Sequence, residues 1–308
     1  MSAWLKGVIV ASLTPFTENL EIDTKAVAWL FERFVEAGIQ GAFIAGTTGE
    51  WPMLKPTDRE RLANTVLETV NGRLKILLGV SGLSYDDTLT NARILKNVDV
   101  DGYVATPPLY FKPSREKMRE YYLKLADELD KPLVLYTIPS RVGYNLPADL
   151  VAELAQEHSL IAGIKATVPD LHYLHELIAN VKSIRPDFSV LAGYGEYLVD
   201  SLVAGGDGAV DALSNLVPKL TAEIYKAWCE SRYNDVFKLH AALARLATLL
   251  RSIKPIQSLM KGVLSSLGAP VKPVVRPPLA LVSPKDIALV STILCTAYRE
   301  YLIYPDKC

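Results

Sequence analysis

Lys165 is a basic side chain inside a short apolar segment. It lies in residues 161–167 (IAGIKAT), a run that is typical of a buried strand. Transfer of an ammonium ion into apolar surroundings is costly, so a buried lysine tends to lose its proton. A neutral amine can attack a carbonyl carbon and form an imine. The segment therefore predicts a nucleophilic lysine; the alternative is a lysine at the end of a strand whose ammonium group reaches water.

Other side chains suited to carbonyl chemistry also follow apolar segments. They are Thr47 and Thr48 in residues 46–50 (GTTGE), Tyr110 in 106–110 (TPPLY), Tyr136 and Arg141 in 136–141 (YTIPSR), Thr167, and Gly193 and Glu196 in 193–196 (GYGE). A phenol such as Tyr136 can transfer protons to and from a carbinolamine oxygen, and Thr47 and Tyr110 could hold it in a hydroxyl relay. Glycines beside the two threonines would let backbone amides approach an anion. Arg141 can bind a carboxylate through two hydrogen bonds.

Each of these residues, taken singly, also has an ordinary structural explanation. A tyrosine is more often a packed phenol, and a threonine pair beside glycine often only shapes a turn. An arginine is usually a surface residue, and a glutamate in the first turn of a helix is favoured by the helix dipole. Only a fold that brings the set together would favour catalysis over these alternatives.

Short β-rich segments alternate with longer amphipathic segments. The β-rich segments are residues 7–14, 41–46, 75–80, 102–106, 133–137, 162–166, 189–192 and 208–212, and the helical segments after them are 24–37, 57–70, 85–95, 114–129, 148–157, 170–181, 197–204 and 218–231. Eight β/α units predict an α/β fold, a closed parallel (β/α)8 TIM barrel, with an open doubly wound sheet as the alternative. Thr57 and Glu60 have the spacing of a capping box, and residues 283–286 (SPKD) predict another helix start.

The barrel prediction places the reactive residues. Active sites of such barrels lie at the carboxyl ends of the strands, so Lys165 and the residues that follow the other strands are expected to face one common mouth. Residues 205–208 (GGDG) precede a strand and would lie at the opposite end. The glycines of 193–195 could instead bind phosphate, which leaves a flavin- or phosphate-binding barrel as an alternative. We expect a catalytic barrel over residues 1–233 and a C-terminal helical extension over residues 234–308.

Composition narrows the class of protein. The chain has 308 residues, 50% of them hydrophobic, and a net charge of −1. Without basic runs, a nucleic-acid partner is not expected, and strand-sized apolar stretches predict no membrane span. Residues 1–13 lack the pattern of a signal peptide, so a cytoplasmic location is expected. The chain has three cysteines, Cys229, Cys295 and Cys308, and their odd number and wide spacing predict neither a disulfide framework nor a zinc site. Two histidines, His172 and His175, have a spacing that could bind a metal ion but lack further ligands. Neither a metal nor a cofactor is therefore expected.

The chain resembles the class I, pyruvate-dependent lyase family of dihydrodipicolinate synthase and N-acetylneuraminate lyase. The resemblance is carried by residues 14–16 (TPF), 46–50 (GTTGE), 136–143 (YTIPSRVG), 163–165 (GIK) and 276–279 (RPPL), in the order and approximate spacing of that family. It implies that Lys165 forms the imine with pyruvate and that Tyr136 transfers protons. It further implies that Thr47 links Tyr136 to Tyr110 of a neighbouring subunit, in a homotetramer built as a dimer of dimers.

The resemblance leaves two substrates open. Arg141 matches the position that binds the carboxylate of aspartate semialdehyde in dihydrodipicolinate synthases, which favours that condensation modestly. Residues 193–196 (GYGE) resemble the loop with which sugar-acid lyases hold hydroxylated chains, and Thr137 and Leu109 stand where many relatives have asparagine and tyrosine. The alternative is therefore cleavage of a 2-keto-3-deoxy sugar acid, of the 2-keto-3-deoxygluconate or N-acetylneuraminate type. A different class is a silent keto-acid-binding regulator on the same scaffold.

Overall fold

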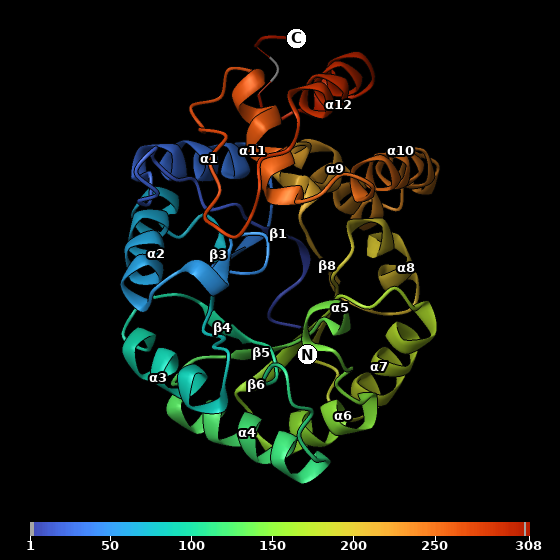
Figure 1. The fold of residues 1–308 in the computed structure, drawn as a ribbon. Helices are drawn as coiled ribbons and strands as arrows, with labels where there is room; N and C mark the ends of the chain where they lie inside the picture. Colours follow the sequence, from blue (N-terminus) through green and yellow to red (C-terminus); the bar gives the residue numbers. More distant parts are fainter. Residues whose placement is uncertain (1–2, 305) are drawn as a thin grey trace.

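Eight parallel strands form a closed barrel (Figure 1). The computed structural model describes residues 3–304 and 306–308. The strands are β1 (Gly7–Ala11), β2 (Gly41–Ile44), β3 (Lys75–Gly79), β4 (Gly102–Ala105), β5 (Leu133–Thr137), β6 (Ile161–Ala166), β7 (Ser189–Ala192) and β8 (Gly208–Asp211). They pair in chain order, and β8 returns to β1. The barrel prediction is confirmed, and the open doubly wound sheet is wrong.

Gly208 shows how tightly the barrel closes. It pairs with Gly7 where β8 meets β1. A Cβ atom on Gly208 would lie 2.0 Å from the carbonyl oxygen of Gly7, and its φ of 144° is one that side chains rarely adopt. Closure at this point therefore depends on glycine.

Helices surround the barrel (Figure 1). They are α1 (Thr24–Glu36), α2 (Pro56–Val70), α3 (Tyr85–Leu95), α4 (Arg115–Glu128), α5 (Pro139–Val142), α6 (Ala148–Glu157), α7 (Leu171–Ile184), α8 (Leu198–Val203) and α9 (Pro218–Cys229). The capping box predicted for Thr57 and Glu60 is wrong. The helix begins earlier, at Pro56, and the Asp58 carboxylate accepts a hydrogen bond of 3.1 Å from the Lys55 amide. Proline is favoured at a first helical position because it lacks the amide hydrogen that would otherwise go unpaired.

Among the described residues, three α-helices follow the barrel: α10 (Tyr233–Arg251), α11 (Ile256–Ser266) and α12 (Pro284–Ala297). Figure 1 shows them on one side of the barrel, near α1 and α9. Ser283 caps α12 as predicted, since its hydroxyl accepts a hydrogen bond from the Asp286 amide. C-terminal helices are thus confirmed, and the exact boundary at residue 234 stays a prediction. No helix among residues 3–304 and 306–308 is long and apolar enough to cross a membrane.

A buried ion pair joins the barrel to α11. Lys261 donates to the Glu50 carboxylate over 2.6 Å, and both side chains are fully buried. The second carboxylate oxygen of Glu50 accepts from the Arg276 amide, and Lys261 also donates to the Val274 carbonyl. Burial lowers the pKa of Lys261 to about 8, although the negative charge of Glu50 opposes that shift. The pair connects the loop after β2 to segments more than two hundred residues away.

We expect Lys261→Met to lower the free energy of unfolding by about 3–5 kcal/mol, because it leaves the Glu50 carboxylate buried without its cation. Urea unfolding at pH 7, followed by circular dichroism, would measure the loss. The double variant Lys261→Met/Glu50→Gln removes both charges and should recover much of the stability. Equal unfolding midpoints for the single variant and the wild type would contradict a stabilising role for the pair.

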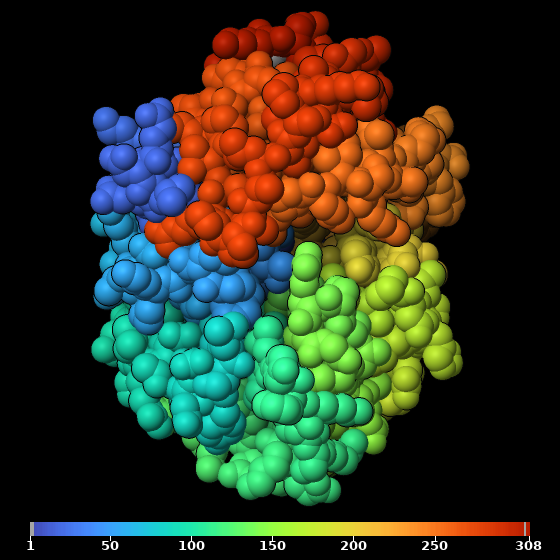
Figure 2. All heavy atoms as spheres, in the orientation of Figure 1, coloured from blue at the N-terminus to red at the C-terminus, as the bar shows by residue number. Residues whose placement is uncertain are grey.

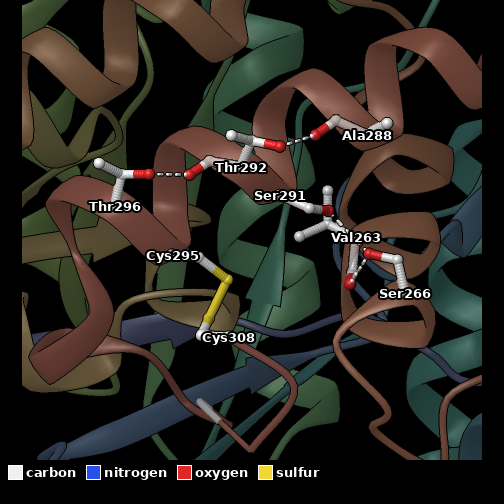
Figure 3. The surroundings of a disulfide bond; sticks show 8 residues. All are labelled: Val263, Ser266, Ala288, Ser291, Thr292, Cys295, Thr296 and Cys308. Atoms are coloured by element: carbon white, nitrogen blue, oxygen red, sulfur yellow. Dashed lines mark hydrogen bonds between the residues drawn. A yellow bond between two sulfur atoms is a disulfide. The ribbon is translucent and has the colours of Figure 1, made fainter.

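The structure corrects the expectation for the cysteines. Cys295, on α12, forms a disulfide with Cys308 (Figure 3). Cys229 is free. Residue spacing could not predict this bond, because it depends on the chain after α12 folding back onto that helix. The two cysteines are 13 residues apart in the sequence. A disulfide across a loop of this length restricts the unfolded chain, which in the chain-entropy view stabilises the folded state by about 3 kcal/mol.

Candidate active site

A cavity of about 230 Å³ opens at the carboxyl ends of the strands. Figure 2 shows this face of the molecule, with a hollow near its centre where segments from the first half of the chain meet the C-terminal part. Eight of the nine predicted site residues line the cavity: Thr47, Thr48, Tyr136, Arg141, Lys165, Thr167, Gly193 and Glu196. The closed barrel brings them together because they lie in or after the carboxyl ends of four strands, β2, β5, β6 and β7.

Lys165 lies deep in this cavity. It belongs to β6, and its side chain is only 4% exposed. Its Nζ atom lies 4.3 Å from the ring centre of Tyr136 and 5.0 Å from that of Phe43. The β5–β6 register sets Tyr136 directly beside Lys165. The amine therefore faces the cavity between two aromatic rings rather than reaching bulk water.

Tyr136 is the proton-transfer candidate. Its hydroxyl lies 3.4 Å from the Thr47 hydroxyl, and the residue is 2% exposed. Burial alone would raise the pKa of this phenol, but the positive charge of Lys165 and hydrogen bonds with Thr47, Thr167 and Lys165 outweigh it and lower the pKa below its ordinary value. A phenol made more acidic in this way gives up its proton more readily.

Thr48, Thr167 and Gly193 form further walls of the cavity. Gly193 follows β7 and donates its amide to the Ala166 carbonyl over 2.7 Å. A Cβ atom on Gly193 would lie 1.9 Å from the hydroxyl oxygen of Thr167. Glycine is therefore required where the loop after β7 passes the end of β6, and this close approach keeps the Thr167 hydroxyl at the cavity.

Glu196 differs from its expected arrangement. Sequence reasoning left its carboxylate free to accept hydroxyl groups of a substrate, but the carboxylate is ion-paired with Arg251 at the end of α10. The guanidinium of Arg251 also lies 5.7 Å from the ring centre of Tyr194. Glu196 thus lines the cavity with its charge already partly neutralised.

Tyr110 does not reach the cavity of its own chain. It is 88% exposed, and its ring packs against Phe111, 4.8 Å away between ring centres. The expectation that two tyrosines of one chain share the mouth is therefore wrong. The loop between β4 and α4 carries Tyr110 outward, with a left-handed φ of 74° at this residue.

Asp211 was missed by sequence reasoning. It ends β8, is 2% exposed and lines the cavity. Burial raises its pKa, although hydrogen bonds from the amides of Leu213 and Ser214 and the charge of Lys165 act in the opposite direction. The signal was present, because a carboxylate in the apolar segment 208–212 (GAVDA) is as unexpected as the amine of Lys165.

Arg251 and Lys254 were also missed. Both line the cavity, yet they come from the end of α10 and from the segment before α11. No local pattern identifies them, since their place depends on how the C-terminal helices pack on the barrel. Among the residues that the structure describes, no group of three His, Cys, Asp or Glu side chains is arranged to hold a metal ion.

Known proteins with similar sequence and structure cover nearly the whole chain. The dihydrodipicolinate synthetase family matches residues 4–296. An "uncharacterized DapA-like lyase" of Thermofilum pendens is 38% identical over 279 residues, which are 91% of this chain and 93% of that protein. The "probable 2-dehydro-3-deoxy-D-pentonate aldolase YjhH" of Escherichia coli K12 is 32% identical over 273 residues, covering 89% and 91% of the two chains. The crystal structure of YagE from E. coli K12, a protein of the dihydrodipicolinic acid synthase family in complex with pyruvate, is similar with a TM-score of 0.91 at 30% identity, covering 95% and 98%.

These relationships and the lysine-centred cavity define an enzyme of the carbon–carbon lyase class. The chain belongs to the dihydrodipicolinate synthetase family and is a pyruvate-dependent lyase. The family predicted from the sequence is confirmed. Both substrate classes considered from the sequence are compatible with membership of this family.

Proposed function

We propose that this enzyme cleaves and forms 2-keto-3-deoxy sugar acids through an imine on Lys165. The observation that carries the proposal is the buried amine of Lys165 beside the Tyr136 phenol, whose hydroxyl lies next to that of Thr47. The names of YjhH and of similar aldolases favour a sugar acid as the substrate.

In cleavage, the unprotonated amine of Lys165 attacks the C2 carbonyl of the substrate and gives a carbinolamine. Tyr136 then donates its proton to the departing hydroxyl, which leaves as water, so that a protonated imine on Lys165 and the Tyr136 phenolate remain. The Tyr136 phenolate takes the proton of the C4 hydroxyl as the C3–C4 bond breaks, so the bonding electrons pass to the imine and an aldehyde leaves. The resulting enamine gains a proton at C3. Water then releases pyruvate and regenerates the amine. The positive charge on the Lys165 nitrogen, which the protonated imine keeps, and the Thr47 hydroxyl make Tyr136 suited to carry these protons in both directions.

The carboxylate beside the substrate carbonyl is assigned to Thr47 and Thr48. These residues lie in the glycine-flanked loop after β2, and Thr48 is buried at the cavity. Hydroxyl groups and closely approached backbone amides bind carboxylates well. Substrate-binding roles for Arg141, Thr167, Gly193 and Glu196 belong to the same proposal.

A homotetramer also forms part of the proposal. Tyr110 is exposed and remote from its own cavity, so it could complete the relay of Tyr136 and Thr47 only in another subunit. The exposed rings of Tyr110 and Phe111 form an apolar tip of the kind that packs between subunits. A cytoplasmic location stays a prediction from the sequence.

Condensation of pyruvate with aspartate semialdehyde is the second candidate. Arg141 favours it, because this arginine lines the cavity and has the geometry to bind a carboxylate through two hydrogen bonds. Both reactions use the same pyruvate imine. They differ only in the aldehyde that reacts with the nucleophilic carbon of the pyruvate enamine.

The imine is tested by incubating the enzyme with pyruvate and sodium borohydride and mapping the modified peptide by mass spectrometry. We expect reduction at Lys165. Pyruvate release from 2-keto-3-deoxygluconate, compared with consumption of pyruvate in the presence of aspartate semialdehyde, then separates the two candidates. Binding of pyruvate without any trapped adduct would instead support a silent keto-acid-binding regulator.

A further inference from the structure

A glutamine of the C-terminal helices contacts the loop that carries Thr47. Gln257 lies in the first turn of α11 and is 7% exposed. Its side-chain amide donates a hydrogen bond of 2.9 Å to the backbone carbonyl of Thr47, 210 residues away in the sequence. The hydroxyl of the same threonine lies 3.4 Å from that of Tyr136. Thr47 therefore connects α11 to the group that is proposed to carry the protons.

Gln257 approaches Thr47 from a different cavity than Lys165. A second cavity, of about 650 Å³, adjoins the first. Of these two cavities, Gln257 lines only the second and Lys165 only the first, whereas Thr47 lines both. Any effect of Gln257 on the chemistry at Lys165 must therefore pass through Thr47.

The loop after β2 has a backbone that needs support from other segments. Ala45 and Glu50 have left-handed φ values of 50° and 64°. Such values are uncommon for residues other than glycine and persist where surrounding contacts hold them. Within the loop, the Thr47 carbonyl accepts one hydrogen bond, of 3.2 Å, from the Glu50 amide, which is at the long end of the usual range. The shorter bond from Gln257 is the tertiary contact that orients this carbonyl.

The same helix also holds the other end of the loop. Lys261 lies four residues after Gln257, a spacing that places both side chains on one face of α11. Lys261 forms the buried ion pair with Glu50. The two contacts differ in kind, because the ion pair anchors the end of the loop, whereas the neutral bond from Gln257 orients the Thr47 peptide. Loss of the neutral bond alone should leave the loop anchored but free Thr47 to shift.

Resting on the proposed function, in which Tyr136 carries the protons, we propose that Gln257 is a positioning residue for the reaction. It fixes the Thr47 peptide and so keeps the Thr47 hydroxyl within hydrogen-bond distance of the Tyr136 phenol. The helix α11 thus contributes to the proton-transfer geometry of the barrel that precedes it in the chain.

The test measures how fast pyruvate forms the imine on Lys165, because this step uses a proton from Tyr136 and needs no aldehyde. Enzyme and saturating pyruvate are mixed, borohydride is added at successive times, and the adduct is quantified by mass spectrometry. We expect Gln257→Met to slow adduct formation about tenfold, since displacement of a catalytic group is costly. Gln257→Glu keeps the shape of the side chain, but an ionised carboxylate cannot donate to a carbonyl, so it should be slowed as much.

A double-mutant comparison separates positioning from a general structural role. Thr47→Val removes the hydroxyl at nearly constant volume and should slow adduct formation by about tenfold or more. Gln257→Met added to Thr47→Val should cause little further loss, because both substitutions act through the same hydroxyl. Two independent effects would instead multiply.

The pKa of Tyr136 gives a second readout. The hydrogen bond with Thr47 is one of the causes that lower the pKa of this phenol, so Gln257→Met and Thr47→Val should both raise it. NMR of isotope-labelled tyrosine rings would measure the shift, with the Tyr136 signal assigned by its loss in Tyr136→Phe. Lys165 and Tyr194 also interact electrostatically with the phenol, and both remain in the two variants.

Gln156→Met is the matched control, because Gln156 is an exposed glutamine of α6 that lines neither cavity. It should form the adduct at the wild-type rate. Wild-type rates in Gln257→Met and Gln257→Glu would overturn the positioning role, as would an undiminished further loss in the Thr47→Val background. Loss of the folded circular dichroism spectrum in both Gln257 variants would assign this residue to stability instead. If the wild type forms the adduct in these cases, only this inference fails; if it forms none, the proposed function fails as well.

Discussion

Lys165→Ala is expected to abolish turnover, with a loss of at least about 10⁴-fold, because the substitution removes the amine on which the covalent intermediate is proposed to form. The variant should also show no adduct after treatment with pyruvate and borohydride. The barrel should remain folded, since the substitution removes a buried amine that lies between the rings of Phe43 and Tyr136 rather than in an ion pair. Pyruvate release and the circular dichroism spectrum, recorded on the same preparation, would measure both effects.

The matched control for this variant is Lys75→Ala. Lys75 is also a strand lysine, but it begins β3 at the end of the barrel opposite the cavity, and its side chain is 45% exposed. The turnover of Lys75→Ala should equal that of the wild type. A folded Lys165→Ala protein that still releases pyruvate at a rate within tenfold of the wild type would show that another nucleophile forms the intermediate.

Tyr136→Phe has the second-largest expected effect, a fall in kcat of about 100-fold or more, as is typical for loss of a positioned proton-transfer group. The ring remains, so its packing against Phe43 and Lys165 is retained, and only the proton carrier is lost. In the wild type the cleavage rate should rise with pH through the pKa of this phenol. That rise should come at lower pH than for an ordinary phenol, because Lys165 and the neighbouring hydroxyl groups lower the pKa. The variant should lose this rise.

Tyr122→Phe provides the comparison for the phenol. Tyr122 is a fully buried tyrosine of α4, outside the cavity, and burial raises its pKa. Removal of its hydroxyl should change neither kcat nor the pH profile. If Tyr136→Phe kept both the rate and the rise with pH, Tyr136 would not be the group that carries the proton.

Much of the fold could be predicted because its pattern is local. All eight strands and the eight main barrel helices were placed within a few residues, since apolar periodicity and turn residues mark each unit. The short helix α5 was missed, because four residues are too few to show a period. The start of α2 was misplaced because Thr57 and Pro56 both offer good start signals, and only the folded chain shows which is used.

Most of the candidate site could be predicted because a parallel barrel places the carboxyl ends of all its strands at one end. Lys165, Tyr136 and Thr47 meet for this reason. The residues that were missed or misplaced depend on longer contacts. Its place after β4 predicted Tyr110 at the cavity of its own chain, but the loop carries it outward, and its role in a neighbouring subunit, which the family resemblance implies, stays a prediction.

The sequence by itself determined the β/α alternation, the closed barrel and the buried amine, since each is encoded in the residue types of a short segment. Only the tertiary structure decided which distant groups meet that amine. Three features depend on how the C-terminal helices and tail pack. They are the ion pair of Glu196 with Arg251, the position of Lys254 on the wall of the cavity, and the disulfide between Cys295 and Cys308. The reason is physical: strand and helix formation depends on neighbours in the chain, whereas the charge at the mouth depends on contacts between segments that the sequence keeps far apart.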